Sequence, residues 1–225
     1  MAAGSLTHMI KRVGICGSGI MGSGIAEVAA KAGFDVVLRS RHQATADATI
    51  AGLEKSLQRQ VDKGRLSEED RNSVLGRVSG TERIADLADC DLVIESVVED
   101  LATKKALFLE LDHAIQAGAI LATNTSTLPV IEMAVETGRA DRFCGIHFFN
   151  PAPAMSLVEV VRPLTASDET IAQAKQFAAD CGKNTTGVSN NAPRDPVLVS
   201  VNVPPESSSG LSLFSRVRAA RSAIS

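Results

Sequence analysis

Short apolar runs alternate with helix-like segments along most of the chain. The apolar runs have the length of buried strands and lie at residues 13–16, 36–38, 91–95, 119–123, 144–149 and 157–161. The segments between them have helical spacing or composition and lie at residues 20–31, 44–63, 103–117 and 168–181. Ser67, followed by three acidic residues, marks one more helix start. This alternation predicts a three-layer α/β/α fold, doubly wound around a mostly parallel sheet.

The pattern changes after Gly182-Lys183. Residues 184–225 contain nine Ser and four Arg but no Lys, and only two acids. Four prolines would interrupt any helix in this segment. We therefore expect one domain over residues 10–183 and a poorly ordered tail over residues 184–225. Translation in a shifted reading frame after residue 190 would produce such a composition, and this is our hypothesis for it.

Composition and charge exclude several classes of function. The 225 residues include 23 basic and 26 acidic side chains, so the chain offers no basic footprint for a nucleic acid. No apolar run approaches the roughly 20 residues of a membrane span. The four cysteines lie far apart, without the paired spacing of a zinc site or a disulfide framework. We expect a cytoplasmic protein without a metal site, a membrane segment or a nucleic-acid partner.

A glycine-rich turn lies between the first apolar run and the first helical segment. Its pattern is Gly17-x-Gly19-x-x-Gly22, with Ile20 and Met21 between the last two glycines. In such a strand–turn–helix unit the first glycine permits the tight turn, the second lets the backbone approach a pyrophosphate, and the third lets the helix pack closely. The N–H groups at the helix start then bind the phosphates. The turn predicts a Rossmann-type dinucleotide site, and a turn needed only for backbone geometry is the alternative.

The end of the second apolar run bears on which dinucleotide is bound. An acidic residue there accepts hydrogen bonds from the adenosine ribose and repels a 2′-phosphate. The chain has Arg39-Ser40-Arg41 instead. Two guanidinium groups and a hydroxyl group suit a phosphate, which arginine binds through two parallel hydrogen bonds. We expect NADP to be preferred over NAD, with surface arginines in a solvated loop as the alternative.

Five segments together carry a family resemblance. Their sequences are GSGIMGSGIA at residues 17–26, VIESVVED at 93–100, NTST at 124–127, HFFNPAP at 147–153 and LVEVV at 157–161. With these motifs the chain resembles the 3-hydroxyacyl-CoA dehydrogenase family, most of all its bacterial 3-hydroxybutyryl-CoA dehydrogenases. The resemblance implies reversible oxidation of a short-chain 3-hydroxyacyl-CoA, such as 3-hydroxybutyryl-CoA, to the 3-oxoacyl-CoA. The hydride would pass to a nicotinamide cofactor, in fatty acid and butanoate metabolism.

The resemblance also implies the catalytic residues. It assigns His147 as the general base and acid, since imidazole exchanges protons near neutral pH. Glu159 corresponds to the carboxylate that orients this ring. Ser126 matches a substrate-facing hydroxyl group, and Asn150 matches a residue near the nicotinamide and the histidine. Without the surrounding motif, His147 would more simply be a core histidine, Glu159 a solvated acid on an edge strand, and Ser126 a turn residue bonded to the backbone.

Further positions match ligand contacts in the family. The cofactor positions are matched by Glu99, Lys104, Asn124, Ser126 and Asn150. Ser56 and Lys63 match positions that contact coenzyme A, where Lys63 would pair with phosphate groups. A serine and a lysine on a solvated helix face are the simpler interpretation of these last two.

One part of the family pattern is not found. Family members continue after the Gly-Lys pair into a G-F-x-x-N segment and a helical domain, which supplies another active-site Asn and the interface of a homodimer. Residues 190–196 are NNAPRDP instead. Two functions therefore stay open: an active acyl-CoA dehydrogenase that uses His147, and a dinucleotide-binding domain with weak or no turnover. A different Rossmann-type reductase is a third interpretation, which the HFFNP run disfavours.

Overall fold

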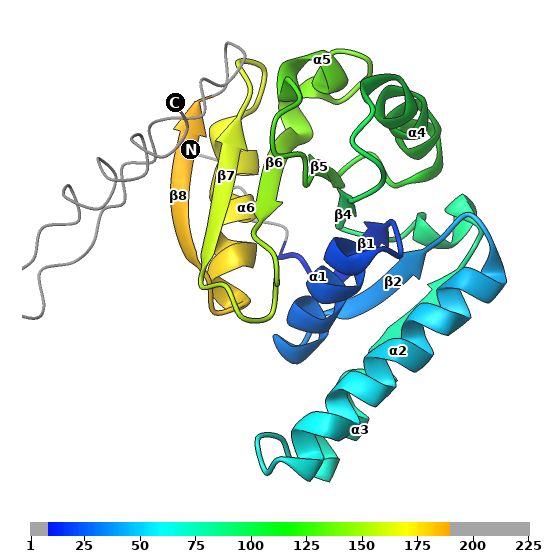
Figure 1. Ribbon diagram of the computed structural model, residues 1–225. Coiled ribbons are helices and arrows are strands. Elements are labelled where there is room, and N and C mark those ends of the chain that lie inside the picture. Colours follow the sequence, from blue (N-terminus) through cyan, green and yellow to red (C-terminus); the bar gives the residue numbers. More distant parts are fainter. Residues whose placement is uncertain (1–8, 190–225) are drawn as a thin grey trace, which may run out of the picture. The chain divides into compact units, whose positions relative to one another are not determined.

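One eight-stranded sheet organises residues 9–189, the part of the chain that the computed structural model describes (Figure 1). Its strand order is β3-β2-β1-β4-β5-β6-β7-β8. The strands are β1 (Arg12–Cys16), β2 (Asp35–Arg39), β3 (Val78–Thr81), β4 (Leu92–Glu95), β5 (Ile120–Thr123), β6 (Phe143–Phe148), β7 (Leu157–Arg162) and β8 (Asn184–Ser189). Neighbouring strands are parallel, except that β6 and β7 pair antiparallel. The predicted mostly parallel sheet is confirmed.

Helices cover both faces of this sheet (Figure 1). They are α1 (Ile20–Lys31), α2 (Gln43–Asp62), α3 (Glu68–Gly76), α4 (Leu101–Ala114), α5 (Val130–Ala134) and α6 (Asp168–Asp180), with short 3₁₀ helices at Ile84–Leu87 and Ala140–Arg142. Successive strand residues enter opposite cores. In β4, Leu92 and Ile94 pack with α1 and α6, whereas Val93 packs with α4 and α5. The doubly wound, three-layer fold is therefore confirmed.

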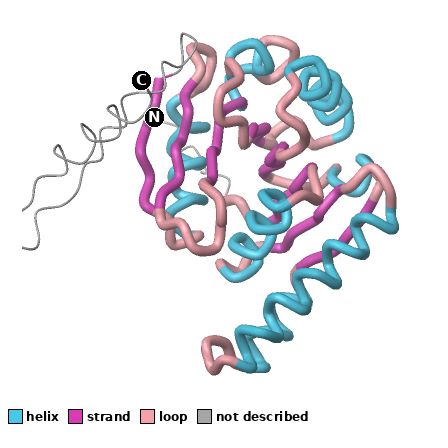
Figure 2. The backbone as a smooth tube through the Cα atoms, in the orientation of Figure 1, coloured by secondary structure: helices cyan, strands magenta, loops and turns pink. Residues whose placement is uncertain are grey.

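Helices α2 and α3 form an antiparallel pair that extends away from the sheet (Figure 2). The predicted cap of α3 is confirmed, because Ser67 Oγ accepts a hydrogen bond from Asp70 N at 3.0 Å. Within the described residues, every helix is too short or too polar to cross a membrane.

The main differences from the sequence prediction lie at the two edges of the sheet. The apolar pattern predicts neither β3 nor β8, whose sequences are VSGT and NTTGVS. An edge strand has one neighbour and is partly exposed, so it carries only a weak apolar signal. Because β8 pairs with β7, the domain extends through Ser189, which corrects the boundary expected at residue 183. The rest of the expected tail, residues 190–225, lies outside the described residues.

Close packing explains two glycines of the turn after β1. Gly17 has a φ of +127°, a backbone conformation that residues with a Cβ rarely adopt. A Cβ at this position would also overlap the carbonyl oxygen of Ser96. A Cβ on Gly22 would overlap the carbonyl oxygen of Gly17. The first and third glycines therefore have the steric roles that their spacing predicts.

Two glycine substitutions test this packing in opposite directions. We expect Gly22→Ala to lower the free energy of unfolding by about 1–3 kcal/mol, because the added methyl group meets rigid backbone. Gly52→Ala, on α2, meets open space and removes glycine's unfolded-state entropy, so it should raise stability by about 0.5–1 kcal/mol. Urea denaturation followed by circular dichroism measures both. Equal stabilities for the two variants would contradict the packing role of Gly22.

Candidate active site

The carboxyl ends of β1, β4, β5 and β6 meet along one edge of the sheet, and backbone groups tie them together. Ser96 N donates to the carbonyl oxygen of Cys16 at 2.7 Å, and Asn124 N donates to that of Glu95 at 2.8 Å. The side chain of Asn124 extends this connection, since its Oδ1 accepts from Phe148 N at 2.8 Å. In open α/β sheets this edge is where ligands bind.

His147 and Glu159 form a cross-strand pair at this edge. They are direct partners in the antiparallel register of β6 and β7. His147 Nδ1 lies 3.0 Å from Glu159 Oε2, and the two side chains are 14% and 5% exposed. The ring of Phe149 lies against the imidazole, with centroids 4.5 Å apart. A carboxylate on Nδ1 fixes the ring orientation and leaves Nε2 as the nitrogen for proton exchange.

The start of α1 has the properties of an anion site. Its N-cap residue, Gly19, has no side chain to cap the free N–H groups, and the first turn contains no acid. The position of a Cβ on Gly19 is open space, so a ligand can approach the backbone there. Ile20 is exposed, and Met21 packs partly on the core. These features fit a dinucleotide pyrophosphate.

Arg39, Ser40 and Arg41 lie at the end of β2, beside the glycine turn. Ser40 is buried, and its Oγ is 2.9 Å from Ser18 Oγ, so its hydroxyl group braces the turn. Arg39 is half-buried and donates from Nε to the carbonyl oxygen of Glu82 at 3.2 Å, whereas Arg41 is exposed. The guanidinium groups of Arg39 and Arg41 are therefore more accessible to a ligand than the buried hydroxyl group of Ser40.

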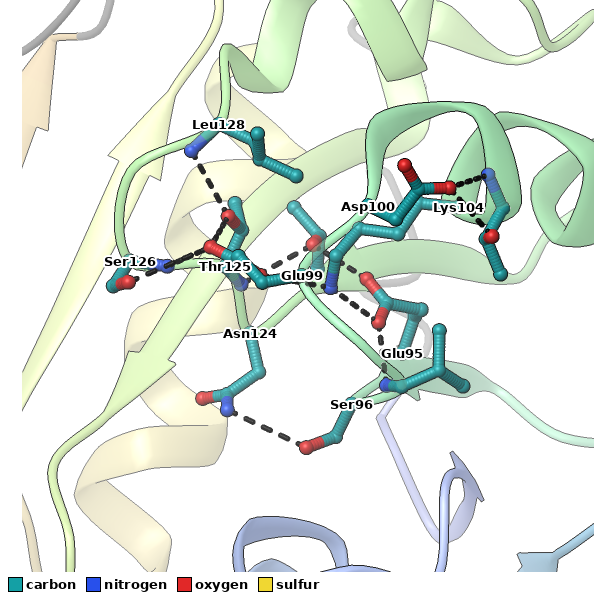
Figure 3. A network of polar contacts seen from close by, with 12 residues as sticks. Glu95, Ser96, Glu99, Asp100, Lys104, Asn124, Thr125, Ser126 and Leu128 are labelled. Atoms are coloured by element: carbon teal, nitrogen blue, oxygen red, sulfur yellow. Dashed lines mark hydrogen bonds and ion pairs between the residues drawn. The ribbon is translucent and has the colours of Figure 1, made fainter.

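A buried ion pair underlies the neighbouring loops (Figure 3). Glu95, at the end of β4, is 0% exposed and lies 2.6 Å from Lys104 Nζ, which is 1% exposed. Glu95 also accepts hydrogen bonds from Val97 N and Thr123 Oγ1, both at 2.7 Å. The pair therefore fastens α4 to the ends of β4 and β5.

The same ammonium reaches Glu99. Lys104 Nζ lies 3.2 Å from Glu99 Oε2, while Glu99 Oε1 accepts from Thr125 Oγ1 and, at 3.1 Å, from Ser126 N (Figure 3). Partial burial raises the pKa of Glu99, but the Thr125 hydrogen bond and the Lys104 charge outweigh it, so the pKa is lowered. Glu99 thereby stabilises the fold above its unfolded pKa, and this contribution is lost as the pH falls through its folded pKa.

The structure brings most of the predicted site residues together. The carboxyl edge of the sheet collects the glycine turn, Glu99, Asn124, Ser126 and His147 with Glu159. Asn150 is exposed in the loop that follows β6. Lys104, expected to contact the cofactor, is buried, and its ammonium points inward to two carboxylates. Ser56 lies on α2 and Lys63 is the C-cap residue of that helix, so neither belongs to the strands and loops that form this edge. Figure 1 shows where α2 lies.

The sequence prediction missed Glu95 as a functional position. A signal was present, since an acid at the end of an apolar run needs a partner and Lys104 follows on the next helix. The Cys16 thiol, at the end of β1, is an inert ionisable group at this edge. Burial raises the pKa of the Cys16 thiol to about 12, so it stays protonated at neutral pH. Within residues 9–189, no cluster of three His, Cys, Asp or Glu side chains forms a metal site.

A glycine turn at a helix start, on the carboxyl edge of a doubly wound sheet, defines a Rossmann-type dinucleotide-binding domain, here with a His–Glu pair at the same edge. Residues 12–192 match the family described as 3-hydroxyacyl-CoA dehydrogenase, NAD binding domain. The chain belongs to this family.

Individual relatives agree with this assignment. A 3-hydroxybutyryl-CoA dehydrogenase of Bradyrhizobium diazoefficiens is 43% identical over 178 residues, which are 79% of this chain and 61% of the relative. One of Mycobacterium tuberculosis H37Rv is 42% identical over 175 residues, which are 77% of this chain and 61% of the relative. The chain thus spans about three fifths of the length of these relatives.

Solved structures show the same similarity. The crystal structure of M. tuberculosis FadB2 superposes with a TM-score of 0.79 at 41% identity, covering 82% of this chain and 66% of that one. The 3-hydroxybutyryl-CoA dehydrogenase of Escherichia coli K12 gives a TM-score of 0.79 at 38% identity, covering 80% of this chain and 38% of that one.

Removing one member of the buried ion pair tests its contribution. Lys104→Met leaves Glu95 as a buried, uncompensated carboxylate, so we expect a loss of about 3–5 kcal/mol in the free energy of unfolding. The double variant Glu95→Gln/Lys104→Met removes both charges and should recover most of this loss. Lys105→Met, at the adjacent surface lysine, is the control and should stay close to wild type. A double variant no more stable than Lys104→Met would argue against a charge effect.

Proposed function

We propose that this chain interconverts a short-chain 3-hydroxyacyl-CoA, such as 3-hydroxybutyryl-CoA, and the corresponding 3-oxoacyl-CoA. The observation that carries the proposal is the His147–Glu159 pair, which lies at the ligand-binding edge of a dinucleotide domain with 3.0 Å between Nδ1 and Oε2. The names of the relatives described above support the same substrate class.

In the proposed oxidation, His147 removes the proton of the 3-hydroxyl group. Its Nε2 takes this proton because Glu159 occupies Nδ1, and the Glu159 carboxylate stabilises the imidazolium that forms. The first turn of α1 would hold the nicotinamide cofactor, which would supply the acceptor for the hydride of C3. In the reverse direction the imidazolium returns the proton to the carbonyl oxygen.

Other residues would position the reactants. The Ser126 hydroxyl group would bond to the substrate oxygen, on a turn that Glu99 holds through the Ser126 N–H. Asn124 and Asn150 would contact the nicotinamide end of the cofactor, and the first turn of α1 its pyrophosphate. Lys63, an exposed cation, would bind phosphates of coenzyme A. Ser56 would contact the same ligand from about two turns earlier on α2.

The location and assembly are parts of the same proposal. The four cysteines are free and three of them are buried, which supports a reducing compartment such as the cytoplasm. We expect a role in fatty acid and butanoate metabolism. The family is homodimeric, but the segment that leads into its dimerising domain is the part of the family pattern that residues 190–196 do not match.

Turnover of acetoacetyl-CoA, followed by the absorbance of the reduced nicotinamide, tests the proposed reaction. We expect His147→Ala to lower kcat by about 10²–10⁴-fold, because a positioned acid–base group contributes that much. His113→Ala, at an exposed histidine on α4, is the control and should keep wild-type turnover. Cofactor binding without turnover in the unmodified chain would overturn the proposal and favour a dinucleotide-binding domain. Equal activity of both variants would exclude His147 as the acid–base group.

NADP is the proposed cofactor, on the strength of the two arginines beside the adenosine end of the site. Arg39→Asp should weaken NADPH binding by about 10- to 100-fold, since charge-assisted hydrogen bonds contribute about 1.5–3 kcal/mol. NADH binding by the same variant should stay unchanged or improve, which makes it an internal control. Titration of the fluorescence of each reduced cofactor measures both affinities. An equal loss for the two cofactors would contradict recognition of a 2′-phosphate.

A further inference from the structure

Lys183 is a buried cation outside the predicted site. It follows α6, at the start of the chain's return to β8, and is 9% exposed. Its Nζ donates to the carbonyl oxygens of Ala152 and Met155, both at 2.8 Å. Among the described residues, no carboxylate forms an ion pair with it. Hydrogen bonds to two carbonyl oxygens thus replace the hydration that the ammonium group loses on burial.

This arrangement is unfavourable for a lysine that only fills space. Loss of hydration lowers the pKa of Lys183, with a smaller contribution from the charge of Lys31. An apolar side chain of similar length would fill the same volume without that loss. The ammonium therefore contributes something that an apolar residue cannot, namely two directed hydrogen bonds to one loop.

That loop, residues 149–156, joins the two strands of the acid–base pair. It starts two residues after His147 and ends three residues before Glu159. A second contact beside Lys183 holds its far end, since Asn184 N donates to the carbonyl oxygen of Ser156 at 2.7 Å. Lys183 and the first residue of β8 thus hold the loop at three carbonyl oxygens.

The loop also packs on α1, the helix that begins at the glycine turn. A Cβ on Gly24, in the second turn of α1, would lie 3.2 Å from Ala152 Cβ and 3.3 Å from Pro153 Cδ. Ala152 is buried in the same core cluster as Ile25 and Ala26 of α1. The loop therefore contacts both Lys183 and α1.

We propose that Lys183 is a positioning residue, which fixes the loop at residues 149–156 against α1 and thereby sets the placement of His147 relative to the bound cofactor. The inference rests on the proposed function for its catalytic consequence. Hydride transfer needs reacting atoms about 3–3.5 Å apart, and a misplacement of about 1 Å costs on the order of 10²-fold in rate. The loop itself is a structural element whose order can be measured without turnover.

The first test replaces the ammonium by an apolar group of similar length. In Lys183→Met we expect kcat to fall by about 10- to 100-fold. The dissociation constant of the reduced cofactor should change less than about threefold, because the glycine turn is untouched. Because the chain contains neither Trp nor Tyr, the fluorescence of the reduced cofactor can be followed without a background from these two residues. Lys175→Met, at an exposed lysine on α6, is the matched control and should keep both quantities.

Hydrogen exchange read by mass spectrometry is the second measurement, and it needs no activity. Peptides that cover residues 150–156 should exchange faster in Lys183→Met, while peptides of β4 and β5 keep wild-type protection. A partner variant, Gly24→Ala, presses on the same loop from α1, so its effect on kcat should be non-additive with that of Lys183→Met.

The outcomes separate this inference from the proposed function. Wild-type exchange of the loop in Lys183→Met would overturn it, as would a cofactor affinity that falls in proportion to kcat, which would indicate general damage to the domain. Wild-type kcat in an active Lys183→Met variant would also overturn it. If the unmodified chain does not turn over acetoacetyl-CoA, the proposed function fails, and the exchange measurement still decides whether Lys183 fixes the loop.

Discussion

The reversal of strand direction between β6 and β7 is the constraint on which the site depends. Every other pair in the sheet is parallel, and a β7 that ran parallel to β6 would need a long crossover connection. The antiparallel pairing instead lets one loop bring Glu159 directly opposite His147, twelve residues earlier in the chain. Both side chains then lie where the parallel strands end, at the same edge of the sheet as the glycine turn.

Two buried lysines hold the loops on either side of this edge, by different chemistry. Lys104 lies between the carboxylates of Glu95 and Glu99 and so supports the turn that carries Ser126. Lys183 donates to backbone carbonyl groups of the loop after His147. A buried ammonium tolerates few alternative arrangements, because each lost hydrogen bond leaves an unpaired charge away from water. The two lysines thereby restrict the turn that carries Ser126 and the loop at residues 149–156 to one conformation each.

Much of the fold could be predicted from the chain because its signals are local. The helix interiors and the central strands have clear apolar periodicity, and the Ser67 cap of α3 lies where the acids after it indicate. The edge strands β3 and β8 were missed because a strand with one neighbour needs few apolar residues. Glu95 was missed because its partners Lys104 and Thr123 become neighbours only after α4 and β5 have packed beside β4.

The sequence by itself determined the dinucleotide turn, the family and the identity of the His–Glu pair. These features consist of residue types at short spacings, which one strand, one turn or one hairpin converts into geometry. The tertiary structure alone decided that Ser40 braces the turn, that the ammonium of Lys104 points inward, and that Lys183 grips the loop beside α1. Each of these depends on contacts between segments far apart in the chain. Burial sets the free-energy cost of leaving a polar group unpaired, and side chains become buried only once the layers have packed.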